Sequence, residues 1–280
     1  MPPNLPIFTG IWYDAATERT VEQTTAILGR AALAFALAVA GGAISAAAQL
    51  SHRRLCILIS LAAGTLLGVT LFSIVPESAA ALRWWELALA LGSGYAVFFL
   101  ISRYIFHVCP ACAASHFDEA VAHRFNEIAS ALIVALGVHS TMDGVALAAG
   151  HEASGRVDAS LLLAVCVHKL PEGLALGALL LGAGYRRVAA VAWVAAVEAT
   201  TLVGAVIGLL CLPAGGTHHA AFWLWAVLAH VGGGFIYLAT HAVLGELVKH
   251  GKAQILTSFA VGVSLIGLLN LLVRFAEGSS

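Results

Sequence analysis

Eight long apolar stretches divide the chain, and most of the connections between them are short and polar. Each stretch is close to the roughly 20 residues that an α-helix needs to cross the hydrocarbon core of a bilayer. The stretches cover residues 26–49, 55–75, 87–106, 128–149, 159–184, 188–212, 222–248 and 255–273. The pattern predicts an all-α integral membrane protein, a bundle of eight transmembrane helices that forms one domain over residues 1–280.

Two polar segments lie outside the predicted spans. Residues 1–25 form a polar leader that carries Asp14, Glu18 and Glu22, and residues 107–127 form the longest connection between spans. The first span has the small residues of a signal peptide, but an acidic leader precedes it, whereas signal peptides begin with basic residues. We therefore expect the first span to be retained as a helix.

The composition is that of a membrane protein and limits the kinds of binding partner to be expected. The chain is 60% hydrophobic and 10% charged, whereas soluble domains average about 25% charged residues. The lipid bilayer is the expected surrounding, and a formal net charge of −1 gives no indication of nucleic acid binding. Five scattered cysteines show no disulfide framework. The sequence leaves pairing with a second copy, as a homodimer, open.

Basic residues in the connections predict the orientation, because cytoplasmic loops carry an excess of Lys and Arg. With the N-terminus outside, the inner connections carry Arg53, Arg54, Arg103, Arg124, Arg186, Arg187, Lys249 and Lys252, and the outer side carries Arg19, Arg30, Arg83, Arg156 and Arg274. Both termini are therefore expected outside.

Glycine pairs at four-residue spacing indicate where helices cross closely, because glycine lets two backbones approach. The pairs are Gly64/Gly68, Gly173/Gly177 and Gly204/Gly208. They predict a compact bundle and identify no function.

Two matched polar motifs lie inside the fourth and fifth spans. His139 and Asp143 are four residues apart in one span, and His168 and Glu172 repeat that spacing in the next. Residues at this spacing share one helix face. Two adjacent helices would then present two imidazoles and two carboxylates to one point, a ligand set that suits a tetrahedral divalent ion such as zinc.

Further polar residues surround this motif. Lys169 lies in the fifth span and Glu198 in the sixth, and a charge at mid-membrane costs about 2.5–3.5 kcal/mol even on insertion scales. These side chains must therefore face inward, where a buried ion-pair network that only joins helices is the alternative to an ion site. Pro171 removes a backbone hydrogen bond to the carbonyl of Val167 and predicts a kink in a hydrated part of the fifth span.

The motifs "HSTMDG" and "HKLPEG" resemble the signature helices of the ZIP (Zrt/Irt-like) family of metal-ion transporters. The segments "GTLLGVTLFSIVPESA", "GYAVFFL" and "GGGFIYLATHAVLGE" resemble its second, third and seventh helices. The resemblance implies an eight-helix bundle with both termini outside, which moves zinc, and often iron, manganese or cadmium, into the cytoplasm. It assigns the primary metal site to His139, Asp143, His168 and Glu172, and a second metal position to Ser140, Lys169 and Glu198.

Three positions depart from the family pattern. Ser140 is a poor metal ligand, Lys169 is a cation where a second metal would lie, and Ser73 replaces a histidine that often precedes the Pro-Glu pair of the second helix. We therefore expect a site for one metal ion. Ionised Asp143, Glu172 and Glu198 with protonated Lys169 would sum to −2, a charge that one divalent cation balances.

The 107–127 connection, expected in the cytoplasm, contains a candidate second site in "HVCPACAASHFDEAVAH". Thiolate and imidazole groups bind zinc, and the four candidate ligands are His107, Cys109, Cys112 and His116. The alternative is a pair of reduced cysteines in a disordered loop.

The sequence thus predicts a transporter and not an enzyme, in the plasma membrane (in bacteria, the inner membrane). An intramembrane zinc-dependent hydrolase would use the same ligands to activate water, but it would need an open coordination position and a general base. A metal-gated channel or sensor is the third hypothesis, which the sequence cannot separate from a carrier.

Overall fold

The computed structural model describes residues 21–48, 52–106, 125–153, 155–212, 218–247 and 252–278. Every regular element in these residues is helical, and eight helical stretches are long and apolar enough to cross a membrane. The predicted fold class, an all-α bundle with eight membrane-spanning stretches, is confirmed.

Five spans are single helices: α2 (Val21–Ala47), α7 (Phe125–Glu152), α8 (Gly155–Gly182), α11 (His218–Leu247) and α12 (Lys252–Gly278). The other three are composed of shorter segments. The second span comprises α3 (His52–Val69), the π-helical turn η1 (Thr70–Ile74) and α4 (Val75–Ala81). The third comprises α5 (Trp84–Leu100) and the π-helical turn η2 (Ile101–Phe106), and the sixth comprises α9 (Arg187–Glu198) and α10 (Thr200–Cys211).

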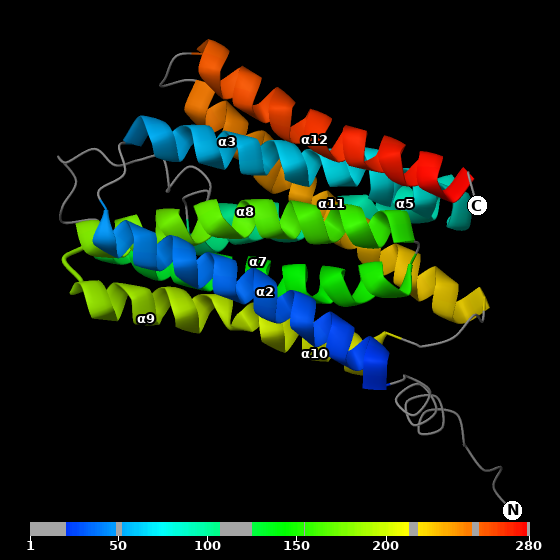
Figure 1. Cartoon of the computed structure of the whole chain (residues 1–280), viewed down its shortest axis with the longest axis horizontal. Coiled ribbons are helices and arrows are strands. Elements are labelled where there is room, and N and C mark those ends of the chain that lie inside the picture. The colour runs from blue at the N-terminus through cyan, green and yellow to red at the C-terminus, as the bar shows by residue number, and fades with distance from the viewer. Residues whose placement is uncertain are drawn as a thin grey trace, which may run out of the picture.

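The helices run up and down between two ends of the bundle (Figure 1). We call one end the terminal face, because α2 begins there and α12 ends there, together with the meeting points of α4 with α5 and of α7 with α8. We call the other end the loop face, where α2 ends and α3 begins and where α8 turns into α9. An even number of spans places both described chain ends on the same face.

A left-handed glycine allows the tight turn from α8 into α9. Gly184 has φ +86°, a conformation that costs glycine little because it has no Cβ. The Tyr185 N–H donates to the carbonyl of Leu180 at 3.0 Å, and the Gly184 N–H donates to that of Leu181 at 3.0 Å. These two bonds form a Schellman motif, which satisfies the last carbonyls of α8.

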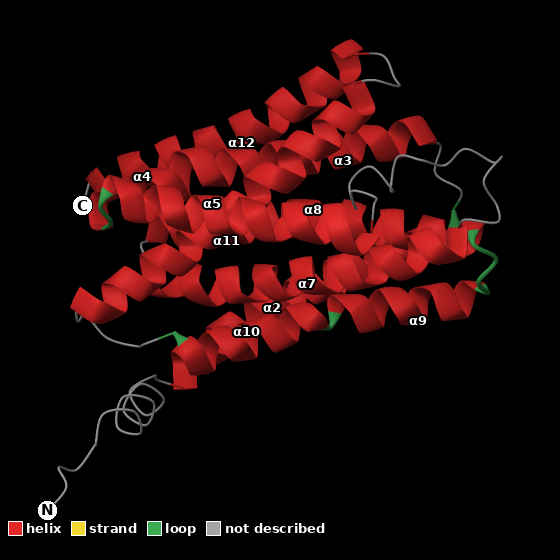
Figure 2. Ribbon diagram, turned by 180° about the vertical axis from the view of Figure 1, so that it is seen from behind, coloured by secondary structure: helices red, strands yellow, loops and turns green. Residues whose placement is uncertain are grey.

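The break between α9 and α10 divides the sixth span at Ala199, visible as a short loop between the two helices (Figure 2). The hydroxyl of Thr200 donates to the carbonyls of Gly137 on α7 at 2.9 Å and of Val197 at 2.7 Å. Glu198, the last residue of α9, is thereby held beside α7.

Glycines set the closest helix crossings, as predicted. Gly173 on α8 meets the backbone of α2, where a Cβ would collide with the carbonyl of Ala38. Gly204 on α10 meets the carbonyl of Thr141 on α7, and Gly64 on α3 meets that of Phe259 on α12. Since the first two crossings involve the helices with the matched motifs, they fix the helix positions around the middle of the bundle.

The largest apolar cluster fills the half of the bundle next to the terminal face. It draws on the first half of α2, the end of α7, the first half of α8 and the second half of α12. Its fully buried members include Ile27, Val69, Ile74, Ala146, Leu161, Val165, Leu228 and Ile266. Smaller clusters, such as that of Leu176 and Leu180 with Val194, occupy the half next to the loop face.

Candidate metal site

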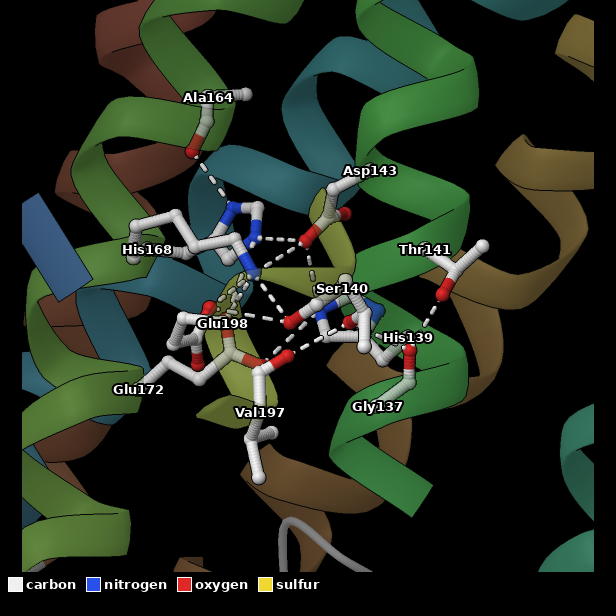
Figure 3. Close-up of polar contacts among 12 residues, drawn as sticks. Gly137, His139, Ser140, Thr141, Asp143, Ala164, His168, Glu172, Val197 and Glu198 are labelled. Atoms are coloured by element: carbon white, nitrogen blue, oxygen red, sulfur yellow. Dashed lines mark hydrogen bonds and ion pairs between the residues drawn. The ribbon is translucent and has the colours of Figure 1, made fainter. Parts of the chain in front are cut away.

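The four side chains of the matched motifs converge between α7 and α8. One ligand atom from each of His139, Asp143, His168 and Glu172 lies within 4.8 Å of the others. Figure 3 shows both imidazoles turned toward the carboxylates. Because each motif spans one helical turn, the convergence follows directly from the four-residue spacing on two packed helices.

The carboxylate of Asp143 lies at the centre of this group. Its Oδ2 is 3.1 Å from Nε2 of His168 and 3.5 Å from Nε2 of His139. The carboxylate of Glu172 lies 4.0 Å from each imidazole, with Oε1 toward His139 and Oε2 toward His168. Asp143 is fully buried, and both histidines are nearly so.

The ring of His168 is oriented by its own helix. Its Nδ1 lies 2.8 Å from the carbonyl oxygen of Ala164. A carbonyl only accepts hydrogen bonds, so Nδ1 carries the hydrogen and Nε2 faces Asp143. In the neutral ring Nε2 carries a lone pair. Nε2 and the carboxylate oxygen of Asp143, 3.1 Å apart, would repel each other unless a proton or a metal ion lies between them.

Aromatic side chains form the wall beside the two imidazoles. Phe235 of α11 lies edge-on to both rings, with centroid distances of 6.3 Å to His139 and 6.4 Å to His168. Phe98 of α5 also lies edge-on to His139 at 6.1 Å. These contacts hold the rings in place and come from helices outside the motif pair.

Lys169 lies in the middle of the remaining polar groups. Its side chain is fully buried, and Nζ lies 2.8 Å from Glu172 Oε2, 2.8 Å from Glu198 Oε2 and 2.9 Å from Asp143 Oδ2. It also donates to the hydroxyl of Ser140 at 2.7 Å. One ammonium group therefore touches three carboxylates from α7, α8 and α9.

Several polar atoms of the cluster have no hydrogen-bond partner in the protein. Lys169 occupies one oxygen of each carboxylate, and the other oxygens, Asp143 Oδ1, Glu172 Oε1 and Glu198 Oε1, are buried without a hydrogen bond. Unpartnered buried acceptors are costly. These carboxylate oxygens lie beside two imidazole nitrogens, and such oxygens and nitrogens are ligands that a divalent cation uses. The residues present therefore fit such an ion.

Pro171 does not interrupt the helix that carries the fifth-span motif. α8 continues from Gly155 to Gly182 with Pro171 inside it and buried. The carbonyl of Val167, four residues earlier, lacks its usual donor. Pro171 is thus accommodated without a helix break next to the candidate ligands.

Other histidines of the seventh span lie away from this group. Nδ1 of His230 is 2.8 Å from the hydroxyl of Ser93 on α5, and the ring of His241 stacks on Tyr237 with centroids 4.0 Å apart. The candidate loop ligands His107, Cys109, Cys112 and His116 lie outside the described residues. Among the described residues, the motif tetrad is the one group with metal-ligand geometry.

The sequence did not predict a second group of polar contacts, which joins the second span to α12. Ser73, expected to depart from a histidine position, is buried and bonded to Asn270 of α12. Asn270 is 197 residues away from Ser73 and is neutral. The only available signal was a lone amide inside an apolar span, which is too common to single out.

Known proteins match much of this chain. The sequence pattern of the family described as ZIP Zinc transporter matches residues 107–270. The zinc transporter zipt-7.2 of Caenorhabditis elegans is 33% identical over 114 residues, 41% of this chain and 24% of the relative. The zinc transporter YKE4 of Saccharomyces cerevisiae is 26% identical over 219 residues, 71% of this chain and 62% of the relative.

A further relative, the zinc transporter zipt-7.1 of Caenorhabditis briggsae, is 29% identical over 140 residues, 49% of this chain and 35% of the relative. The chain spans between 24% and 62% of the length of these relatives. The family match covers more than half of the chain and includes both motif helices and the tetrad. The chain therefore belongs to the ZIP zinc transporter family, a family of transporters and not of enzymes.

Proposed function

We propose that the protein moves divalent metal ions across a membrane into the cytoplasm, with zinc as the main substrate. The observation that carries this proposal is the meeting of two imidazoles and two carboxylates from α7 and α8 in mid-bundle. Zinc favours nitrogen and carboxylate ligands in tetrahedral geometry. The three relatives are all zinc transporters by name, which supports the same substrate.

The two carboxylates and the two histidines of the tetrad have different parts in holding the ion. Asp143 and Glu172 supply negative charge, and His139 and His168 supply nitrogen ligands of intermediate softness. The bond from His168 to the Ala164 carbonyl keeps the Nε2 lone pair aimed at the ion, as supporting hydrogen bonds do at metal-bound histidines. Iron, manganese and cadmium are the other substrates to be tested.

Lys169 limits the site to one metal ion in this proposal. Its ammonium lies among Asp143, Glu172 and Glu198, where a second cation would otherwise need to bind. Three ionised carboxylates and one ammonium sum to −2, and one divalent ion brings the total to zero. A site balanced in this way holds its substrate in a low-dielectric setting without a net charge.

The proposed orientation of the bundle in the membrane rests on the distribution of basic residues. Among the described residues, six basic residues lie toward the loop face and four toward the terminal face: Arg53, Arg54, Arg103, Arg186, Arg187 and Lys252 against Arg30, Arg83, Arg156 and Arg274. The excess assigns the loop face to the cytoplasm. The terminal face is then outside.

A channel gated by the metal would use the same ligands. Carrier and channel differ in kinetics, since a carrier saturates and supports counter-flow of labelled metal against unlabelled metal. The carrier is the function proposed, and a counter-flow measurement in proteoliposomes separates it from the channel.

Metal flux into proteoliposomes tests the proposal. Purified protein is reconstituted, and uptake of zinc, iron, manganese and cadmium is followed with an internal indicator or radiometal. We expect saturable zinc uptake that folded His168→Ala protein lacks. Uptake no faster than that of protein-free liposomes, for every metal in the panel, would refute the transport function.

A further inference from the structure

An ion pair joins the beginning of α8 to the helix before α5. Arg156, in the first turn of α8, pairs with the carboxylate of Glu77 on α4. Both side chains are partly exposed at the terminal face, with 20% of each accessible. The pair ties the helix that carries His168 and Glu172 to the second span, which carries no ligand of the tetrad.

One helical turn deeper, a buried amide makes a second connection between the same regions. The amide nitrogen of Asn270 on α12 donates to the hydroxyl of Ser160 on α8 at 2.9 Å and to that of Ser73 on η1 at 2.9 Å. Ser73 and Ser160 are fully buried, and Asn270 is nearly so. Because buried polar groups in an apolar setting must find partners, these bonds hold α8, η1 and α12 in one register.

The two connections close the route between the tetrad and the terminal face. Ser160 precedes His168 by eight residues, or roughly 12 Å along an α-helix. The intervening space is filled by the large apolar cluster, in which Leu161 and Val165 are fully buried. We expect that an ion passes this apolar packing only when α8 separates from α12 and the second span.

The second span has an irregular segment at this contact. The N–H of Val75 bonds to the carbonyl of Thr70, a spacing of five residues that defines the π-helical turn η1. Pro76 follows it and has no N–H to donate. Such π-helical turns are frequent at functional sites, and this one contains Ser73.

We propose that the pair Arg156–Glu77 and the bonds from Asn270 to Ser73 and Ser160 form a latch that keeps the metal site closed toward the terminal face. The latch must release for a metal ion to enter from that face. This inference rests on the proposed transport function, since it assigns the step that regulates access to the same site. The conformation in which these contacts are formed is the latched state. Release of the contacts shifts the population toward a conformation that is open at the terminal face.

Labelling of a buried cysteine tests the latch without any need for transport. Val165→Cys places a thiol in the apolar cluster at nearly unchanged volume. A membrane-impermeant maleimide is added outside the proteoliposomes. A protease-cleavable N-terminal tag, cut only where the N-terminus faces outward, identifies the molecules whose terminal face is exposed to the reagent. Each variant is also measured without the added thiol, so that labelling of native cysteines is subtracted.

We expect slow labelling with the latch intact, and labelling faster by about five-fold or more in Glu77→Gln or Asn270→Ala. The double exchange of Glu77→Arg with Arg156→Glu should restore slow labelling. Gln254→Ala is the matched control, because it removes a contact between α12 and Arg53 of α3 at the opposite end.

Unchanged labelling in both Glu77→Gln and Asn270→Ala would overturn the latch, as would equal acceleration by Gln254→Ala. The Glu77→Gln variant alters a partly exposed side chain, so the test remains even if Asn270→Ala does not fold. Zinc flux is measured on the same preparations. Absent flux with the expected labelling pattern would refute transport and leave the latch standing.

Discussion

Nζ of Lys169 lies 2.9 Å from Oδ2 of Asp143, the same oxygen that faces Nε2 of both His139 and His168. A lysine ammonium and two imidazoles thus share one carboxylate oxygen in the middle of an apolar bundle. Lys169 gives each of the three carboxylates a positive partner, and a buried charge left without a partner is strongly destabilising. We therefore expect Lys169 both to stabilise the folded protein without metal and to limit the site to one metal ion.

Replacing Lys169 with methionine removes the ammonium and keeps an unbranched side chain that is one atom shorter. Three carboxylates then face one another, and we expect the metal-free protein to lose about 3–5 kcal/mol of unfolding free energy. Added zinc should recover a larger part of the stability in the variant than in the wild type. Thermal unfolding in detergent, with and without zinc, measures both effects.

Arg187→Met is the control for that substitution, because Arg187 is an exposed cation at the start of α9. It should change stability by less than about 0.5 kcal/mol. Equal stability of the Lys169→Met and Arg187→Met proteins would argue against a balancing role for Lys169.

Lys169→Asp tests the metal count directly. The variant removes the ammonium that now donates to Glu198 and Ser140 and adds a shorter carboxylate directed toward the same space. Carboxylates in this position favour a divalent cation, so we expect one additional zinc per chain. Anomalous scattering from zinc-soaked crystals should show one intramembrane zinc peak in the wild type and two in the variant. Two peaks around Lys169 in the wild type would disprove the one-metal site.

His168→Ala should abolish zinc flux or reduce it severely while the protein still inserts into the membrane. The variant removes a nitrogen ligand and leaves two carboxylates and one imidazole, a set that departs from the tetrad. His230→Ala is the matched control, since His230 contacts Ser93 and lies outside the tetrad. The assignment of His168 fails if the folded variant retains wild-type flux.

Cys109→Ser combined with Cys112→Ser should remove one bound zinc while most of the transport remains. The two cysteines lie in a connection between spans and not in the tetrad. Zinc per chain is measured by elemental analysis after dialysis, and flux is measured on the same sample. Cys211→Ser, a single free cysteine at the end of α10, should change neither value. An unchanged zinc content in the double variant would exclude the loop site.

The eight spans and the tetrad were predictable from the sequence because both rest on short-range patterns. Apolar runs of membrane length identify the spans, and the four-residue spacing of His139 with Asp143 and of His168 with Glu172 identifies the shared faces. The inward orientation of Lys169 and Glu198 followed from the cost of leaving either charge in lipid, whereas their direct contact depends on the packing of α8 against α9.

The remaining contacts depend on tertiary packing, for which one sequence has no signal. Asn270 meets Ser160 across 110 residues, and neutral polar side chains are common in membrane helices. Phe235 lies against both imidazoles, yet its position in the chain is that of any apolar residue of α11. The π-helical turn at Thr70 also leaves the apolar pattern of the second span unchanged.

Gly173→Ala should weaken the crossing that positions α8. An added Cβ would collide with the backbone carbonyl of Ala38 on α2, and a backbone atom cannot rotate away as a side chain can. We expect a loss of about 1–3 kcal/mol in stability and reduced zinc flux, because Gly173 is adjacent to Glu172. Gly92→Ala is the matched control, since a Cβ at Gly92 on α5 meets nothing within 4 Å. Stability of the two variants is compared by thermal unfolding, and a Gly173→Ala protein as stable as the Gly92→Ala protein would show that the α2–α8 crossing tolerates separation.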